Sequence, residues 1–203
     1  MYSIDSKLKE VALVQLRPTQ LTVGFKEVEK KRKSWAKLSS DERRDAMRRE
    51  LFPAVKGPDA CFYILDHHHT AAALIKEESD SVLVGTVKDL SSLEAKRFWI
   101  FMDHYSWVHP YDGDGNRRAF EEIPSSFEDL KDDPYRSLAG EVRDAGGFAK
   151  SDTPFLEFLW ANHFRDAISG KLLEKDPEKA IARAMALARS RKSSFLPGWS
   201  GAR

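Results

Sequence analysis

A single carboxylate and three consecutive imidazoles stand together at Asp66, His67, His68 and His69, and Thr70 follows them directly. The apolar residues before this run suit a short buried strand, and the small residues after Thr70 suit the start of a helix. The first turn of a helix has backbone N–H groups without internal partners and carries the positive end of the helix dipole, so it attracts anions. Histidine adds hydrogen-bond donors and a proton that titrates near neutral pH. The run therefore predicts an anion site at a strand-to-helix turn.

Two other interpretations of the histidine run stay open. It could be an exposed surface run in which Asp66 is a plain N-cap, or it could bind a metal ion. Consecutive side chains on a helix point about 100° apart, so three adjacent histidines reach one ion only where the backbone is irregular. The sequence contains no His-Glu-x-x-His pair and no Cys-x-x-Cys pair. We therefore predict no metal site built by the protein alone and favour anion binding.

Composition and charge narrow the class of protein. The 203 residues carry 33 Lys and Arg against 32 Asp and Glu, so the formal net charge is only +1. Such a balance gives the whole chain no basic field, so a nucleic-acid partner has no support from net charge. Cys61 is the only cysteine, which excludes an intramolecular disulfide. Because no apolar stretch approaches the roughly 18 residues that cross a bilayer, we expect no membrane segment and a cytoplasmic location.

The elements that must position the run follow from hydrophobic periodicity. The pattern predicts strands at 11–16, 52–55, 60–65 and 81–87, with 52–55 at a sheet edge because it contains Pro53. It predicts helices at 25–38, 41–51, from 70 onward, 93–105, 134–145, 155–168 and 177–189. The fold class is therefore α+β. A small mixed sheet within residues 1–90 forms a strand-turn-helix core, and a helical C-terminal half, 91–203, packs on it as one structural unit.

An ordered set of fragments across residues 11 to 168 resembles the ParB-like nuclease superfamily, in particular its branch with an Asp-His-His-His motif. The first half of the chain contributes Val14-Gln15-Leu16-Arg17-Pro18-Thr19-Gln20, Val23-Gly24, Lys30 or Lys31, Phe52-Pro53-Ala54-Val55 and Asp66-His67-His68-His69. The second half contributes Asp133-Pro134-Tyr135-Arg136-Ser137-Leu138, Gly146-Gly147-Phe148 and Pro154-Phe155-x-Glu157-Phe158-x-Trp160-Ala161. The order and spacing of these fragments carry the resemblance, which implies a ParB/sulfiredoxin-like fold.

The resemblance implies that a phosphate binds at the strand-turn-helix motif, as in the partition protein, sulfiredoxin and a free-serine kinase of the same superfamily. On the closest register Asp66, His68 and His69 match the acid and two histidines of the kinase motif. His67 replaces a glycine of that motif, and Thr70 replaces an arginine that would clamp phosphate. The kinase has a catalytic glutamate near the turn where this chain has Gln20, and an amide cannot act as a base.

The resemblance implies a role for each residue of the site. Asp66 and His68 are the predicted catalytic residues, and the predicted phosphate- or nucleotide-binding residues are Arg17, Thr19, His67, His69 and Thr70. Asp66 would orient an imidazole or hold a magnesium ion that arrives with the nucleotide.

Two classes of function follow from these roles. One is a phosphate-handling enzyme, either a nuclease (a hydrolase of phosphodiesters) or a phosphotransferase such as a free-serine-like kinase. The other is a nucleotide-binding regulatory module without rapid chemistry. We expect Arg136 and Arg165 to be structural ion-pair partners of nearby acids.

Overall fold

The computed structural model describes residues 8–202, and it confirms the α+β class. Five strands form one mixed sheet in the order β1-β6-β4-β5-β2, and β3 and β7 form a separate parallel pair. The strands are β1 Leu8–Ala12, β2 Leu16–Arg17, β3 Thr22–Val23, β4 Leu51–Lys56, β5 Phe62–Ile64, β6 Ser81–Asp89 and β7 Lys131–Asp132. The helices are α1 Phe25–Ala36, α2 Ser40–Arg49, α3 His68–Lys76, α4 Ala95–His104, α5 Pro134–Asp144, α6 Leu156–Ala167, α7 Gly170–Lys175 and α8 Pro177–Ala188.

The predicted strand over 11–16 is divided into two strands by a short 3-10 turn, Leu13–Gln15. The strand before the turn, β1, pairs antiparallel with β6, and the strand after it, β2, pairs parallel with β5. These are the two opposite edges of the sheet. Because three residues join the two edges, the sheet is curled into a half-barrel. The curl brings the end of β2 next to the end of β5, from which the histidine run begins.

The prediction of an edge strand at 52–55 is wrong, because β4 lies at the centre of the sheet between β6 and β5. Pro53 has no N–H to donate to a neighbouring strand, but its carbonyl still accepts a hydrogen bond from the Leu65 N–H at 2.8 Å. The register against β6 also shifts between Ala54 and Val55, which is an irregularity of the kind that accommodates proline.

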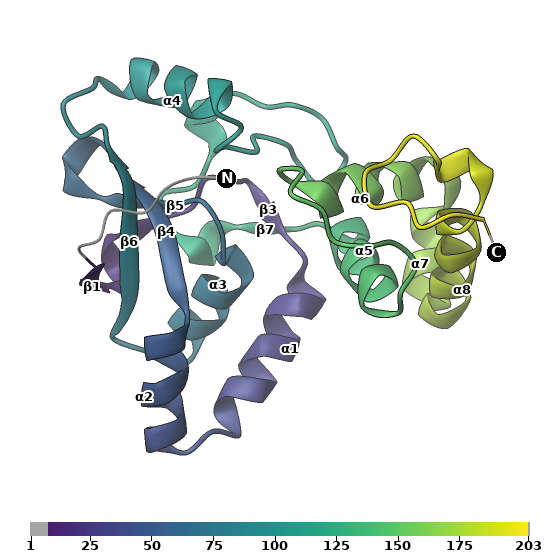
Figure 1. The fold of residues 1–203 in the computed structure, drawn as a ribbon, viewed down its shortest axis with the longest axis horizontal. Coiled ribbons are helices and arrows are strands. Elements are labelled where there is room, and N and C mark those ends of the chain that lie inside the picture. The colour runs from purple at the N-terminus through teal and green to yellow at the C-terminus, as the bar shows by residue number, and fades with distance from the viewer. Residues whose placement is uncertain (1–7, 203) are drawn as a thin grey trace.

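Within residues 8–202, buried apolar residues form three clusters. One lies between the sheet and helices α1 and α3, a second lies under α4, and a third joins α5, α6 and α8. Figure 1 shows α5 to α8 gathered at the C-terminal end, with α1 and α3 between them and the sheet. Phe127 and Leu130, from the second half of the chain, complete the first cluster. None of the helices in residues 8–202 combines the length and hydrophobicity that a bilayer crossing requires.

Local signals explain several boundaries. Helix α2 begins at Ser40, one residue before the start expected at 41, and its N-cap is Ser39. Ser39 and Glu42 form a capping box in which the Ser39 N–H donates to the Glu42 carboxylate at 2.8 Å. Helix α7 was not expected, because six residues are too few to show a helical period. The segment after α8 packs against α6, because Trp160 Nε1 donates to the Pro197 carbonyl at 2.9 Å.

Candidate functional site

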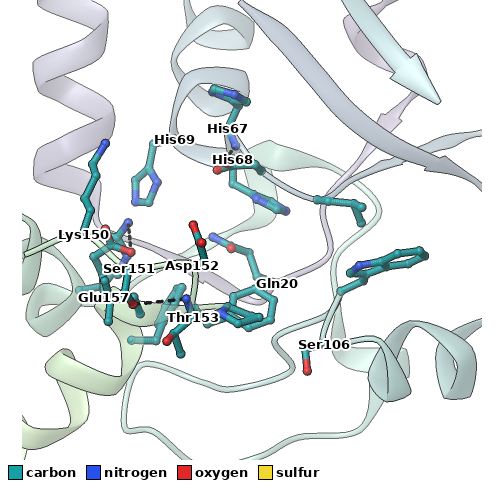
Figure 2. Close-up of a pocket in the computed structure, with 18 of the residues that line it drawn as sticks. Gln20, His67, His68, His69, Ser106, Lys150, Ser151, Asp152, Thr153 and Glu157 are labelled. Carbon is teal, nitrogen blue, oxygen red and sulfur yellow. Dashed lines mark hydrogen bonds and ion pairs between the residues drawn. The ribbon is translucent and has the colours of Figure 1, made fainter. Parts of the chain in front are cut away.

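A cavity of about 1030 Å³ lies where the start of α3 meets α1, α5 and the segment that leads into α6. Both halves of the chain line it, from Gln20 and the histidine run on one side to the 150–158 segment on the other. Figure 2 shows His68 and His69 on one side of this cavity, with Lys150, Asp152 and Glu157 facing them from below. Its walls carry five cationic and four acidic side chains: Lys31, Lys88, Arg136, Arg143, Lys150, Glu27, Asp66, Asp152 and Glu157.

Helix α3 begins at His68, two residues before the expected start, so two of the histidines belong to its first turn. The N-cap is His67, which has a left-handed backbone with φ 66° and ψ 22°. Asp66 is therefore not the N-cap, and its Oδ1 accepts the His67 N–H at 2.7 Å. No side chain caps α3. The N–H groups of its first turn are thus available to a ligand at the cavity wall.

The His68 ring is buried and holds the loop after β2. Its Nε2 lies 3.0 Å from the Thr19 N–H, which donates to it. The Thr19 hydroxyl in turn donates to the Ile64 carbonyl at 2.8 Å. Burial lowers the pKa of His68 to about 3. At neutral pH the ring is therefore neutral, and because Nε2 accepts, its proton lies on Nδ1.

His69 repeats this arrangement one residue later. The Gly24 N–H donates to His69 Nε2 at 3.0 Å, and burial lowers the pKa of His69 well below its ordinary value. The Glu27 carboxylate lies 3.7 Å from the same nitrogen. Since a neutral ring that accepts at Nε2 carries its proton on Nδ1, His68 and His69 each offer one Nδ1–H donor. Neither ring is a cation at neutral pH.

His67 and Thr70 are joined by a residue that the sequence did not point to, Glu50 at the end of α2. His67 Nδ1 lies 3.0 Å from Glu50 Oε1, and the Thr70 hydroxyl donates to the same oxygen at 2.9 Å. The hydrogen bond from His67 lowers the pKa of the Glu50 carboxyl. The Thr70 hydroxyl is thus already used as a donor, so Thr70 offers its backbone N–H to a ligand.

A charged network joins α1 to α5 and α6 beside His69. Arg136 donates from Nη1 to Glu27 at 3.1 Å, and its guanidinium lies 5.4 Å from the centroid of the Phe158 ring. Burial raises the pKa of Glu157, but Arg136 and Arg143 outweigh it, so the pKa of Glu157 lies below its ordinary value. Arg136 is 7% exposed, and its Nε is buried without a partner among residues 8–202. Arg136 therefore lines the cavity through other atoms of its side chain, while its Nε stays buried.

The structure brings together only some of the residues predicted for the site. Asp66, His67, His68, His69 and Thr70 all line the cavity. Thr19 is fully buried behind His68 and does not line it. Arg17 also lies outside the lining, because its Nη1 donates to the carbonyls of Val14 and Leu16 at 2.8 and 2.9 Å.

Two arginines have the roles expected from the sequence, whereas several charged residues of the site were not among the predicted site residues. The expected ion-pair roles of the two arginines are found, although with other partners in part: Arg136 with Glu27 and Glu157, and Arg165 with Asp133 at 2.8 Å. Lys31 and Glu157 were within the fragments that carried the resemblance, so their place in those motifs was the available signal. Glu27, Glu50 and Asp152 gave no such signal, because nothing in their local sequence sets them apart from other surface acids.

The carboxylates and imidazoles do not form a preorganised metal centre. Within residues 8–202 no three His, Cys, Asp or Glu side chains are arranged to hold an ion. Asp66 is exposed and keeps one carboxylate oxygen beyond its bond to the His67 N–H. A single exposed carboxylate fits Mg²⁺, which usually takes one or two carboxylates together with the phosphates of its ligand.

The chain matches known proteins over segments that include residues from both sides of the cavity. A family model described as "Putative ParB-like nuclease" matches residues 9–166, a range that contains both Asp66 and Glu157. The chain is also similar to the crystal structure of protein Atu1540 from Agrobacterium tumefaciens. The two are 44% identical with a TM-score of 0.91, over 97% of this chain and 98% of that chain. No curated protein matches the sequence.

Proposed function

Because this chain belongs to the ParB-like nuclease family, we propose that it binds a phosphate ester at the start of α3 and cleaves it slowly. The observation that carries this proposal is the uncapped first turn of α3 in a cavity that the Arg136 side chain also lines. The two features are independent sources of donors for phosphate oxygens. Their convergence favours an anion over a neutral or cationic ligand.

The cavity suits a ligand of nucleotide size. Its volume of about 1030 Å³ lies at the upper end of the usual range for small-molecule sites. Of its cationic side chains, Lys31 and Lys150 take no part in the Arg136 network. These two ammonium groups are the natural counter-charges for a phosphate that the first turn of α3 holds by hydrogen bonds.

The chemistry that such a site supports is limited. His68 and His69 stabilise negative charge through Nδ1–H donors, and with pKa values far below neutrality they are poor proton carriers. His68 therefore contributes to catalysis by positioning the Thr19 loop and donating to the phosphate. Asp66 is the carboxylate assigned to activate water or to hold a magnesium ion, which would supply charge neutralisation when bound.

A second function, a nucleotide-binding regulatory module without rapid chemistry, is favoured by the same low histidine pKa values. A site that binds phosphate but lacks a base with a pKa near 7 releases its ligand unchanged more often than it converts it to product.

Product analysis separates the two functions. We expect slow ester cleavage that depends on Asp66, His68 and a divalent ion, from nucleotides or from single- or double-stranded DNA. Brisk formation of phosphoserine from nucleotide and serine, unaffected in His68→Ala, would contradict this assignment.

Binding is tested by thermal stability with inorganic phosphate, pyrophosphate and nucleotides, each with and without magnesium. A ligand at 100 times its Kd stabilises the native state by about 2.7 kcal/mol. The variant with His68→Gln and His69→Gln keeps an acceptor for the Thr19 and Gly24 N–H groups but loses both Nδ1–H donors. We expect it to fold and to lose this stabilisation, whereas His104→Gln, an exposed control on α4, keeps it. A double variant that responds fully to every ligand would place the site elsewhere.

A further inference from the structure

The end of α4 places two aromatic rings next to each other at the cavity. Ser106 has a left-handed backbone, φ 54°, and its N–H donates to the Asp103 carbonyl at 3.0 Å. The Trp107 N–H donates to the Met102 carbonyl at 2.8 Å, so the helix ends in a Schellman motif with serine at the position usually held by glycine. This turn brings the ring centroids of Tyr105 and Trp107 to 4.7 Å.

The aromatic pair is supported from behind and open in front. Tyr105 stacks on Phe101 with 4.5 Å between centroids and 17° between planes, which fixes the orientation of its ring. Tyr105 is nevertheless 54% exposed, and both Tyr105 and Trp107 line the cavity. A supported, exposed tyrosine beside a tryptophan is typical of a surface that receives a flat apolar group.

The cavity therefore has two chemically different ends. Figure 2 shows Ser106 on one side of it and Lys150 on the other, with the histidines between them in the upper part. Tyr105 and Trp107 flank Ser106, and Lys88 lies beside them with its ammonium 5.8 Å from the centroid of Phe101, on which Tyr105 stacks. The cations Lys31, Arg136 and Arg143 lie near His69, and Lys150 is on the far side. A ligand that matches both ends has a planar heterocycle at one end and phosphate at the other.

We propose that Tyr105 and Trp107 form a stacking platform for the base of a mononucleotide whose phosphates lie at the start of α3. This inference rests on the proposed function, because it takes the phosphate end as given. Stacking uses the π-face that every base has, so the platform favours nucleotides over other phosphate esters without strong preference for one base. It identifies the ligand class as a nucleotide and assigns to residues 105 and 107 a binding role outside the Asp-His-His-His motif.

The test compares ribose 5-phosphate with a nucleoside monophosphate by titration calorimetry on the full chain. We expect the parent to bind the nucleotide about ten-fold more tightly, and Tyr105→Leu and Trp107→Leu each to remove most of that advantage while leaving ribose 5-phosphate affinity unchanged. Phe195→Leu, which alters a 72% exposed aromatic residue outside the cavity, is the matched control and keeps the advantage. Tyr105→Leu alone decides the matter if Trp107→Leu does not fold.

The outcomes separate the two proposals. Equal affinity of the parent for both ligands, or a nucleotide advantage that survives Tyr105→Leu, overturns the platform and leaves the phosphate site standing. Failure of the parent to bind any phosphate compound overturns both the proposed function and the platform.

Discussion

Acid should destabilise this protein well above the pH at which its carboxylates titrate, because its site histidines are buried in the neutral form. Burial lowers the pKa of His68 from 6.5 to about 3. Between these two values the unfolded chain binds a proton that the native ring does not bind, so stability falls as the pH falls. At pH 5 the loss is about 1.5 pH units at about 1.36 kcal/mol each, or roughly 2 kcal/mol for His68.

The total effect exceeds that of one ring. Burial also lowers the pKa of His109 to about 3, so His109 adds a loss of stability of similar size. Burial lowers the pKa of His69 as well, which adds to the loss. His68 and His109 together lower the free energy of unfolding by about 4 kcal/mol at pH 5. A typical domain has a free energy of unfolding of about 5–15 kcal/mol, so this is a large share. We therefore expect the parent to be only marginally stable at pH 5.

Urea denaturation at pH 7.5 and pH 5 measures this loss. His68→Gln keeps an acceptor for the Thr19 N–H but cannot titrate, so its stability should fall by about 2 kcal/mol less than that of the parent between the two pH values. His104→Gln, exposed on α4, should fall as much as the parent. A parent that loses less than about 1 kcal/mol over this range would refute the assignment of a buried neutral His68. An unchanged slope in His68→Gln would refute it too.

Three further predictions concern how the parts are joined. Gly24→Ala places a Cβ 2.5 Å from the Ser137 Oγ and 2.9 Å from the Ser137 nitrogen. Urea denaturation should therefore show that the free energy of unfolding falls by about 1–3 kcal/mol. An unaltered midpoint would contradict this close approach. Glu50→Ala leaves the donors of His67 and Thr70 without their carboxylate and should cost about 1–3 kcal/mol by the same measurement. Unchanged stability would contradict this prediction and show that solvent satisfies both donors. A fragment of residues 1–90 should not fold, because Phe127 and Leu130 complete the apolar cluster beneath the sheet. Recovery of a stable 1–90 fragment after limited proteolysis would show that the two halves are independent domains.

The local sequence contained enough information for most helices and for the class of the fold. Helix α1 begins at Phe25 and α5 begins at Pro134, as expected, because amphipathic periodicity and a proline in the first turn act over a few residues. The strand-to-helix turn at the histidine run was also predicted from its flanking residues. The family, with its order of fragments, was visible in the sequence and is confirmed.

Only the tertiary structure decided what the histidines do. Nothing near residue 68 indicates that its Nε2 accepts the N–H of Thr19, or that His69 Nε2 accepts the N–H of Gly24, because both partners lie more than 40 positions away. The same holds for Glu50, which binds His67 across the space between α2 and α3. A histidine pKa depends on burial and on charges within a few ångströms, and these arise when distant segments pack. The sequence therefore determines which groups are present at the site, and packing determines which of them are neutral, which are already paired and which remain free for a ligand.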